Sequence, residues 1–220
     1  MQRRFEMYGI PADATEETRR HLAGVLRDTG RHIPLVLDSA VGWNTSSTPV
    51  DLVWEHSYES AATYAEYMHH PFHICILDRY LLPDSPERVT EDRFALQLGL
   101  MGYDIDEPAF RASEGVRRVV ALKMADDAAP HLVAAVCERL RRRAGEVAGV
   151  RLSVVERNTM GLEWFPQGWT HVWEQVFDDE ATMERVCEDE DALWSPPIVR
   201  TAVVHYRIEA AAAPSSEVAG

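Results

Sequence analysis

The chain has 220 residues, of which 46% are hydrophobic and 26% are charged, a composition typical of a globular protein with one large domain or two small ones. Its 36 Asp and Glu residues exceed its 22 Lys and Arg residues, and the formal charge of −14 disfavours nucleic acid and anionic membranes as partners. Because the sequence shows no membrane-spanning run, no signal peptide and only three widely spaced cysteines, we expect a cytoplasmic protein.

Strand-like and helix-like segments alternate in the first half of the sequence. A strand is predicted over Arg3–Tyr8, and the capping-box pattern Asp13–Glu16 then opens a helix. Strand-like stretches follow, and they end in the turn residues Gly42–Asn44 and Ser46–Pro49. The apolar stripe of the first helix comprises Leu22, Val25 and Leu26.

Sequence signals also mark the ends and packing faces of the later helices. The second helix is expected to end at His70-Pro71, because proline cannot continue it, and in the second half Pro130 suits an early helical position. The predicted packing faces of these two helices are Ala61, Tyr64, Ala65 and Met68 in the first, and Leu132, Val133, Val136 and Leu140 in the second. Each half therefore has the order β-α-β-β-α-β, which is typical of an antiparallel sheet with helices on one face.

The sequence also resembles itself at four ordered places. The matching pairs are Arg3–Tyr8 with Arg117–Leu122 and Pro34–Asn44 with Ala148–Asn158 at an offset of 114, Asp51–Tyr58 with Thr170–Phe177 at 119, and Tyr103–Asp106 with Tyr206–Glu209 at 103. We interpret these matches as a tandem duplication. The first copy covers 1–107 with an insertion at 77–94, the second covers 115–210, and a disordered tail is expected at 211–220.

The expected fold class is α+β, with two fused ferredoxin-like repeats. Helices cover one face of each predicted sheet, and the other face must also be covered. Two fused copies can achieve this by packing sheet against sheet, so we expect an intramolecular dimeric α/β barrel. The chain would then be a monomeric pseudo-dimer, with higher oligomers left open.

One run of the first copy carries a resemblance to a known family. Tyr67–His73, with its His-Pro-x-His element, follows the strand Val50–Tyr58. Together with the duplication, this run resembles the stress-responsive dimeric α/β-barrel (Dabb) family. The family includes a plant polyketide cyclase, olivetolic acid cyclase, and a fern hydroxynitrile lyase, besides members without known chemistry. The resemblance implies a small-molecule substrate and no cofactor.

The family's site residues carry over only in part. In the cyclase a strand histidine, a helix tyrosine and the second histidine of His-Pro-x-His line the pocket; the last two match Tyr67 and His73. The strand histidine falls on Leu52 in the first copy. In the second copy it is present as His171, but Asp189–Ala192 replaces His-Pro-x-His. Neither copy contains the whole set.

Strand alternation points to a pocket in the first copy independently of the family. Residues two apart on a strand share a face, and the helix-facing positions there combine acid–base and aromatic groups. Buried groups of this kind are costly unless they pair or line a wet cavity. These positions are Arg4, Glu6 and Tyr8 on the first strand and Leu52, Trp54, His56 and Tyr58 on the third. The matching positions of the second copy include the apolar Val120 and Leu122; whether His171 and Gln175 form a site there stays open.

Roles can be assigned to these residues, each beside a structural alternative. His73 or His56 is the expected general base, Tyr67, Arg4 or both would hold a developing oxyanion, and Glu6 would orient His56 or act as the base itself. The expected substrate-binding residues are Tyr8, Trp54, Tyr58 and His70. The structural alternatives are that His70 and His73 only cap a helix end, that Glu6 and His56 form a buried pair with Arg4, and that Trp54 is a core residue. No metal site is expected, because His69, His70 and His73 are not framed by a carboxylate motif.

Three functions remain open from the sequence. The first is a cofactor-free cyclase, isomerase or lyase that acts on a carbonyl-rich or aromatic molecule by acid–base chemistry. The second is a non-catalytic protein that binds a small molecule or responds to stress. The third is a cofactor-independent monooxygenase of the wider α/β-barrel group, or a haem-binding relative in that group.

Overall fold

The structure, a computed structural model, describes residues 1–91, 100–105, 115–160, 168–188 and 193–208. The predicted tail and the Asp189–Ala192 run lie outside these residues. We call 1–105 the N-terminal half and 115–208 the C-terminal half. Among the described residues, no helix has the length and apolar character needed to cross a membrane.

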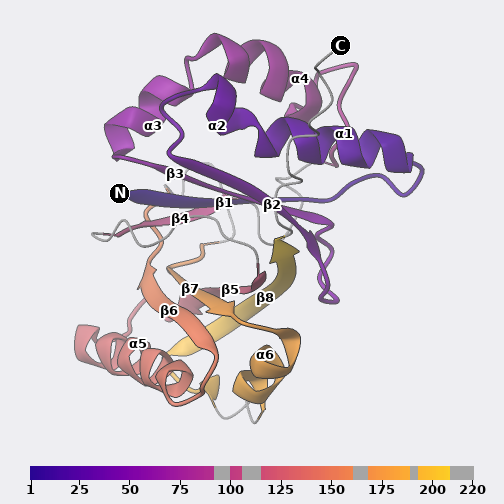
Figure 1. The fold of residues 1–220 in the computed structure, drawn as a ribbon. Helices are drawn as coiled ribbons and strands as arrows, with labels where there is room; N and C mark the ends of the chain where they lie inside the picture. Colours follow the sequence, from indigo (N-terminus) through magenta and orange to yellow (C-terminus); the bar gives the residue numbers. More distant parts are fainter. Residues whose placement is uncertain (92–99, 106–114, 161–167, 189–192, 209–220) are drawn as a thin grey trace.

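The two halves have closely similar element orders (Figure 1). The N-terminal half contains β1 (Gln2–Tyr8), α1 (Glu16–Arg27), α2 (Thr29–His32), β2 (Asp38–Asn44), β3 (Leu52–Tyr58), α3 (Ala61–Tyr67), a π-helix (His73–Leu77), α4 (Asp78–Leu81) and β4 (Leu100–Asp104). The C-terminal half contains β5 (Gly115–Met124), α5 (Pro130–Gly145), β6 (Val150–Arg157), β7 (His171–Phe177), α6 (Glu180–Cys187) and β8 (Ile198–Ile208).

Local signals set where the longer helices begin. The side-chain oxygen of Thr15 accepts the N–H of Thr18 at 3.1 Å, so α1 is capped by Thr15, two residues after Asp13, which the capping-box pattern puts at that position. Leu22 and Leu26 are fully buried on its packing face. The helix α5 begins at Pro130, where the missing proline N–H is harmless.

Two predicted packing faces are wrong in detail. The helix α3 ends at Tyr67 rather than at His70, and the chain becomes helical again from Pro71, through the π-helix and α4. In α3 the fully buried residue is Tyr67, whereas Met68 is exposed, because the helix turns its two large tyrosines rather than its alanines toward the sheet. In α5, Leu132 is 48% exposed, because at 100° per residue it lies roughly 90° from the centre of the buried stripe.

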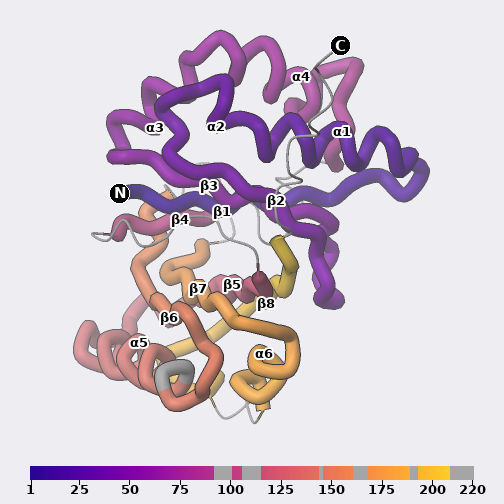
Figure 2. The backbone as a smooth tube through the Cα atoms, viewed as in Figure 1, coloured from indigo at the N-terminus to yellow at the C-terminus, as the bar shows by residue number. Residues whose placement is uncertain are grey.

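The strands form one antiparallel sheet that curls into a nearly closed barrel. Its order is β4-β1-β3-β2-β8-β5-β7-β6, so each half presents its fourth, first, third and second strand in that order. The halves join where β2 pairs with the end of β8 (Figure 2). Gly42 lies at this junction, and a Cβ there would lie 2.8 Å from the Arg207 carbonyl oxygen. The far edges meet through Gly102, whose N–H donates to Asn158 Oδ1 at 3.1 Å and whose oxygen accepts the N–H of Thr159 at 2.9 Å.

The sheet lies between two helical layers (Figure 1). Helices α1–α4 cover the outer face of the N-terminal strands, and α5 and α6 cover the outer face of the C-terminal strands. Side chains alternate as predicted: Phe5 and Met7 belong to the inner core shared by both halves, whereas Tyr8 packs under the N-terminal helices. The interior of the barrel therefore holds one core that both halves share, and each outer face has its own.

A charged cluster lies at the centre of the inner core. One guanidinium nitrogen of Arg3 lies 2.8 Å from Glu174 and 3.0 Å from Glu55, and all three side chains are almost completely buried. Tyr206 O–H donates to Glu55 at 2.9 Å and Tyr103 O–H donates to Glu174 at 2.5 Å. Arg3 thus bridges the two glutamates, and each glutamate accepts a hydrogen bond from a tyrosine of the opposite half.

Candidate functional site

A chain of polar contacts runs across the outer face of β1 and β3, beneath the N-terminal helices. Tyr8 O–H donates to Glu6, whose other carboxylate oxygen lies 3.4 Å from His56 Nε2. The other imidazole nitrogen, Nδ1, lies 2.8 Å from Tyr58 O–H. We call this chain with Tyr67, His73 and Arg4 the N-terminal cluster. It brings acid–base groups from two strands into direct contact.

Tyr67 and His73 extend the cluster from the helical side. The Tyr67 ring centroid lies 5.1 Å from that of Tyr58 and 4.6 Å from that of His73. His73 is the first residue of the π-helix, and its Nδ1 lies 3.8 Å from Asp78 Oδ2. Single π-helical turns occur frequently at functional sites. The Tyr67 hydroxyl has no hydrogen-bond partner in the described part of the chain.

Arg4 supplies a buried cation at the border of the cluster. It is 4% exposed, and its guanidinium lies over the Tyr64 ring at 4.4 Å from the centroid and donates to the Gln2 side chain. Its Nε and Nη1 atoms lack partners among the described residues. Gly102 pairs with Arg4 across β4, and a Cβ there would lie 2.8 Å from Arg4 Cδ, so the glycine leaves room for the arginine.

Burial dominates the electrostatics of the N-terminal cluster. It lowers the pKa of His56 and outweighs the opposing effect of Glu6, so the ring is neutral at pH 7. Burial also raises the pKa of Tyr58 and of Tyr67 well above the ordinary value, and it lowers the pKa of Arg4. The cluster thus combines a neutral imidazole with protonated tyrosines, an arrangement that can move a proton and donate hydrogen bonds.

The structure gathers most of the predicted site residues. Eight of them lie in or directly against the N-terminal cluster: Arg4, Glu6, Tyr8, Trp54, His56, Tyr58, Tyr67 and His73. Trp54 stacks on His56 at 4.1 Å and donates its N–H to Ser39 at 2.9 Å. His70 is placed differently: its Nδ1 accepts the N–H of Phe72 at 3.2 Å, at the start of the next helical segment. Whether any of them is catalytic stays a prediction.

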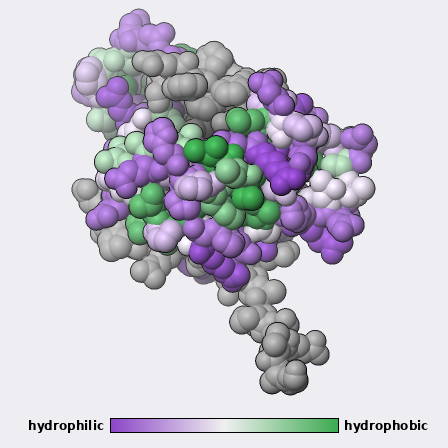
Figure 3. All heavy atoms as spheres, turned by 90° about the horizontal axis from the view of Figure 1, so that it is seen from above, coloured by the Kyte–Doolittle hydropathy of each residue, from purple (hydrophilic) through white to green (hydrophobic). Residues whose placement is uncertain are grey.

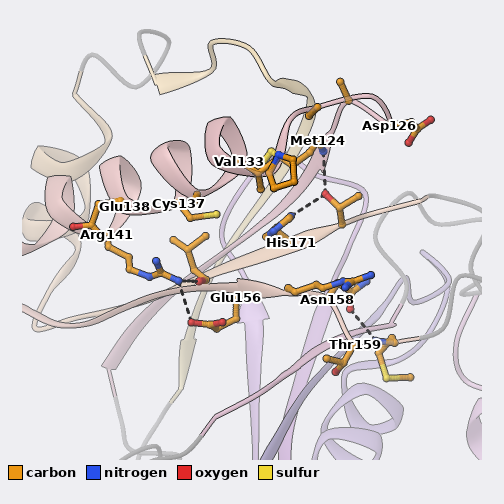
Figure 4. A pocket seen from close by; sticks show the side chains of 18 residues that line it. Met124, Asp126, Val133, Cys137, Glu138, Arg141, Glu156, Asn158, Thr159 and His171 are labelled. Carbon is orange, nitrogen blue, oxygen red and sulfur yellow. Dashed lines mark hydrogen bonds and ion pairs between the residues drawn. The ribbon is translucent and has the colours of Figure 1, made fainter.

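An open cleft lies on the other side of the molecule, in the C-terminal half (Figure 4). It lies between α5 and the strands β6 and β7 and has a volume of about 1430 Å³. None of the predicted catalytic or substrate-binding residues lines it. His171, which the sequence marks only as an open question, lies on its strand wall, and Arg141 reaches it from α5. Within the described residues no group of three His, Cys, Asp or Glu side chains could hold a metal ion.

The exposed face over the N-terminal helices is partly hydrophobic. Figure 3 looks onto this face and shows hydrophobic side chains gathered among hydrophilic ones. Ile74 in the π-helix is 50% exposed, and Met68, at the end of α3, is 37% exposed. The segment that carries His73 therefore borders both the cluster and the surface.

Comparison with known proteins places the fold but not the function. No protein-family model and no curated protein matches the chain. Among solved structures, chlorite dismutase from Candidatus Nitrospira defluvii shares 10% identity over 95% of this chain and 91% of its own, with a TM-score of 0.61. An anthrone oxidase-like protein has a TM-score of 0.62 at 10% identity over 95% and 91%. A monooxygenase candidate from Fusobacterium nucleatum has a TM-score of 0.60 at 9% identity over 94% and 91%.

These neighbours correct the family drawn from the sequence. The expected membership of the Dabb family, with its similarity to olivetolic acid cyclase, is wrong: the similar structures are chlorite dismutase-like and anthrone oxidase-like proteins. The cyclase, isomerase and lyase activities that followed from it lose their support. The resemblance depended on the short run Tyr67–His73 after a strand, and such a local pattern does not distinguish between families that share the strand and helix order.

Proposed function

We propose that the protein is a cofactor-independent oxygenase or oxidase for a small aromatic or carbonyl-rich molecule, and that its reaction takes place at the N-terminal cluster. The observation that carries the proposal is the chain of polar contacts Tyr8–Glu6–His56–Tyr58, buried beside a guanidinium with unpartnered N–H groups. The fold shared with a monooxygenase candidate and an anthrone oxidase-like protein supports the same class of reaction by analogy.

The cluster has the parts that such a reaction needs. A neutral His56 or His73, or Glu6, would take a proton from a C–H bond next to a carbonyl. Arg4 and the Tyr67 hydroxyl would stabilise the enolate oxygen. The electron-rich enolate then reduces O₂ and forms a C–O bond, and loss of water leaves a new carbonyl group. A CH₂ group and O₂ thus give C=O and water, and the carbon loses as many electrons as O₂ gains.

We further infer that the chain is a tandem duplication whose two ferredoxin-like copies, 1–107 and 115–210, form the barrel within one monomeric chain. The identical strand order in the two halves and the exchange of tyrosine–glutamate hydrogen bonds between them support this inference. The cluster does not suit haem, the other branch of the third hypothesis. An imidazole binds iron through a ring nitrogen, and both nitrogens of His56 face other groups, Nε2 toward Glu6 at 3.4 Å and Nδ1 toward the Tyr58 hydroxyl at 2.8 Å.

A non-catalytic binding protein is the second candidate function. It is favoured by the complete burial of His56, Tyr58 and Tyr67, since a substrate can reach them only if the helical cover moves. Such a protein would bind the same class of molecule without turnover.

The test is oxygen consumption with anthrone as the probe substrate, for the wild type and for Glu6→Gln, His56→Gln and His73→Gln. We expect at least one variant to lose on the order of 10²-fold in kcat with KM retained. Gln175→Ala, at the position matching His56 in the other half, is the control and should retain activity. Unchanged oxygen uptake in all three variants would remove the proposal, and tight anthrone binding without uptake in the wild type would favour the binding protein.

A further inference from the structure

The cleft of the C-terminal half has an apolar floor and a polar rim. Met124 and Cys137 are almost completely buried in it, and Val133 packs beside them from α5. At the rim, Arg141 donates to the Val155 carbonyl and lies 3.1 Å from Glu156 (Figure 4). An apolar floor with a few fixed polar groups is the usual form of a small-molecule site.

His171 is held in one orientation by Thr170. Its Nδ1 lies 3.0 Å from Thr170 Oγ1, and that hydroxyl already donates to the Leu122 carbonyl at 3.1 Å and accepts the N–H of Met124 at 2.9 Å. Because the hydroxyl hydrogen is directed to Leu122, the imidazole must supply the hydrogen of the third contact. We therefore assign the hydrogen of the neutral ring to Nδ1. That leaves the lone pair of Nε2 as an acceptor, and Nε2 has no partner among the described residues.

Burial and two nearby arginines favour the neutral form of this imidazole, and the arginines also favour negative charge near it. Burial lowers the pKa of His171, and Arg157 and Arg141 lower it further. Arg157 is the cross-strand partner of His171, so both side chains lie on the same face of the sheet. Arg157 is exposed, and in the described part of the chain it has neither an ion pair nor a hydrogen bond. The cleft thus presents a hydrogen-bond acceptor directly beside a cation without a partner.

We propose that this cleft is a second small-molecule site, specific for a phenol or an enol, that is independent of the N-terminal cluster. The O–H of the ligand would donate to His171 Nε2, Arg157 would stabilise the negative charge that develops on its oxygen, and its apolar body would lie against Met124, Val133 and Cys137. A carboxylate has no hydrogen to donate to Nε2, and an amine cation would be repelled by the two arginines. A weakly acidic hydroxyl group can donate its hydrogen to His171 and also interact favourably with Arg157 as negative charge develops on its oxygen.

The first experiment reads the tautomer of His171 directly. Long-range ¹⁵N–¹H correlation at neutral pH should show His171 protonated at Nδ1 and unprotonated at Nε2. Addition of 2-naphthol should shift the Nε2 resonance of this ring. A ring protonated at Nε2 cannot accept a phenol hydrogen, so that result would overturn the proposal.

The second experiment compares three probes of similar size. The wild type should bind 2-naphthol about tenfold more tightly than 2-methoxynaphthalene, which lacks the donor hydrogen, or 2-naphthoate. His171→Phe should abolish the difference. Because His171 is half-buried, the exposed Arg157→Gln variant provides a second test that leaves the fold intact, and it should weaken 2-naphthol binding alone. His131→Gln on α5, which does not line the cleft, is the matched control and should bind as the wild type does.

Three further outcomes would overturn the proposal. The first is equal affinity for 2-naphthol and 2-methoxynaphthalene. The second is loss of 2-naphthol binding in Glu6→Gln but not in His171→Phe, which would place the phenol in the N-terminal cluster. The third is a Soret band on addition of haemin that disappears in His171→Phe, which would make His171 an iron ligand. Failure of the oxygenase proposal, tested with anthrone and the N-terminal variants, would not affect these measurements.

Discussion

The outer faces of the two halves carry different chemistry at matching positions. Arg4 pairs with His56 across β1 and β3, and at the equivalent place Arg118 pairs with Gln175 across β5 and β7. The other matches on β1 and β5 replace a polar group by an apolar one: Glu6 by Val120 and Tyr8 by Leu122. The N-terminal face thus holds a closed network of acid–base groups, whereas the C-terminal face has an apolar core with an open cleft at its edge.

The features that support the barrel are the same in both halves. Trp54 donates its N–H to Ser39 at 2.9 Å, and Trp173 donates to Ser153 at the same distance. Arg3 and the two central glutamates form one cluster of contacts that joins both halves. The comparison teaches that the interior charges and the tryptophan–serine contacts are common to both halves, while the other positions beneath the helices are free to differ. The predictions below test this division.

The largest effect is expected inside the barrel. Glu174→Gln removes one of the two nearest carboxylates that Arg3 contacts and leaves a buried cation undercompensated, and Glu55→Gln does the same from the other half. Each variant should lose about 3–5 kcal/mol of unfolding free energy in urea titration. Glu16→Gln, which removes only an exposed pair with Arg20, should change it by less than about 0.5 kcal/mol. A large loss in one glutamate variant and none in the other would show that the interior is not shared equally.

An intermediate loss of stability is expected at low pH, and it comes from a histidine on the outer face of the C-terminal half. Burial, with a smaller contribution from Arg118, lowers the pKa of His205 from 6.5 to about 4, and its Nε2 has no hydrogen-bond partner in the described structure. As the pH falls below 6.5, the unfolded chain binds a proton here and the folded chain does not until about pH 4. Stability attributable to His205 is therefore complete above pH 6.5 and is lost between pH 6.5 and 4.

Solvent exposure of the His205 side chain reduces the expected loss of stability. A shift of this size corresponds to roughly 3 kcal/mol, and because the side chain is only partly buried we expect about 1–2 kcal/mol. His205→Gln should flatten the pH dependence of urea unfolding by that amount between pH 7 and pH 4. The matching position in the N-terminal half is Gly102, which cannot titrate. An unchanged slope in His205→Gln would contradict the assignment.

The strand faces could be predicted from the sequence because their cause is local. Residues two apart share a face, so Glu6 and Tyr8 had to lie opposite Phe5 and Met7 wherever the strand was placed. The contact between Glu6 and His56 followed from the same rule once β1 and β3 paired. The offset of 114 also placed Arg118 at the position that corresponds to Arg4.

The cleft and the family could not be predicted, because neither has a local cause. The cleft depends on how far α5 stands from β6 and β7, which no spacing in the sequence records. Its one available signal was His171 opposite an unpaired arginine, and a lone histidine on an apolar strand is more often a core residue. The rotation of α3 toward Tyr64 and Tyr67 was likewise decided by tertiary packing, since a helix of two turns has too few positions for its periodicity to fix one face.

The smallest effect tests the shared tryptophan contact. Ser39→Ala and Ser153→Ala each leave a buried indole N–H without its acceptor, so each should lose about 1 kcal/mol in urea unfolding. The Ser39 variant should lose slightly more, because Ser39 Oγ also donates to the Leu26 carbonyl at 2.8 Å. Combining each serine change with Trp→Phe at its partner should reveal a coupling of about 0.5–1 kcal/mol in both halves. If only one half shows coupling, the two tryptophans are not equivalent, and the two halves differ in the scaffold beneath the helices as well as in the faces that it supports.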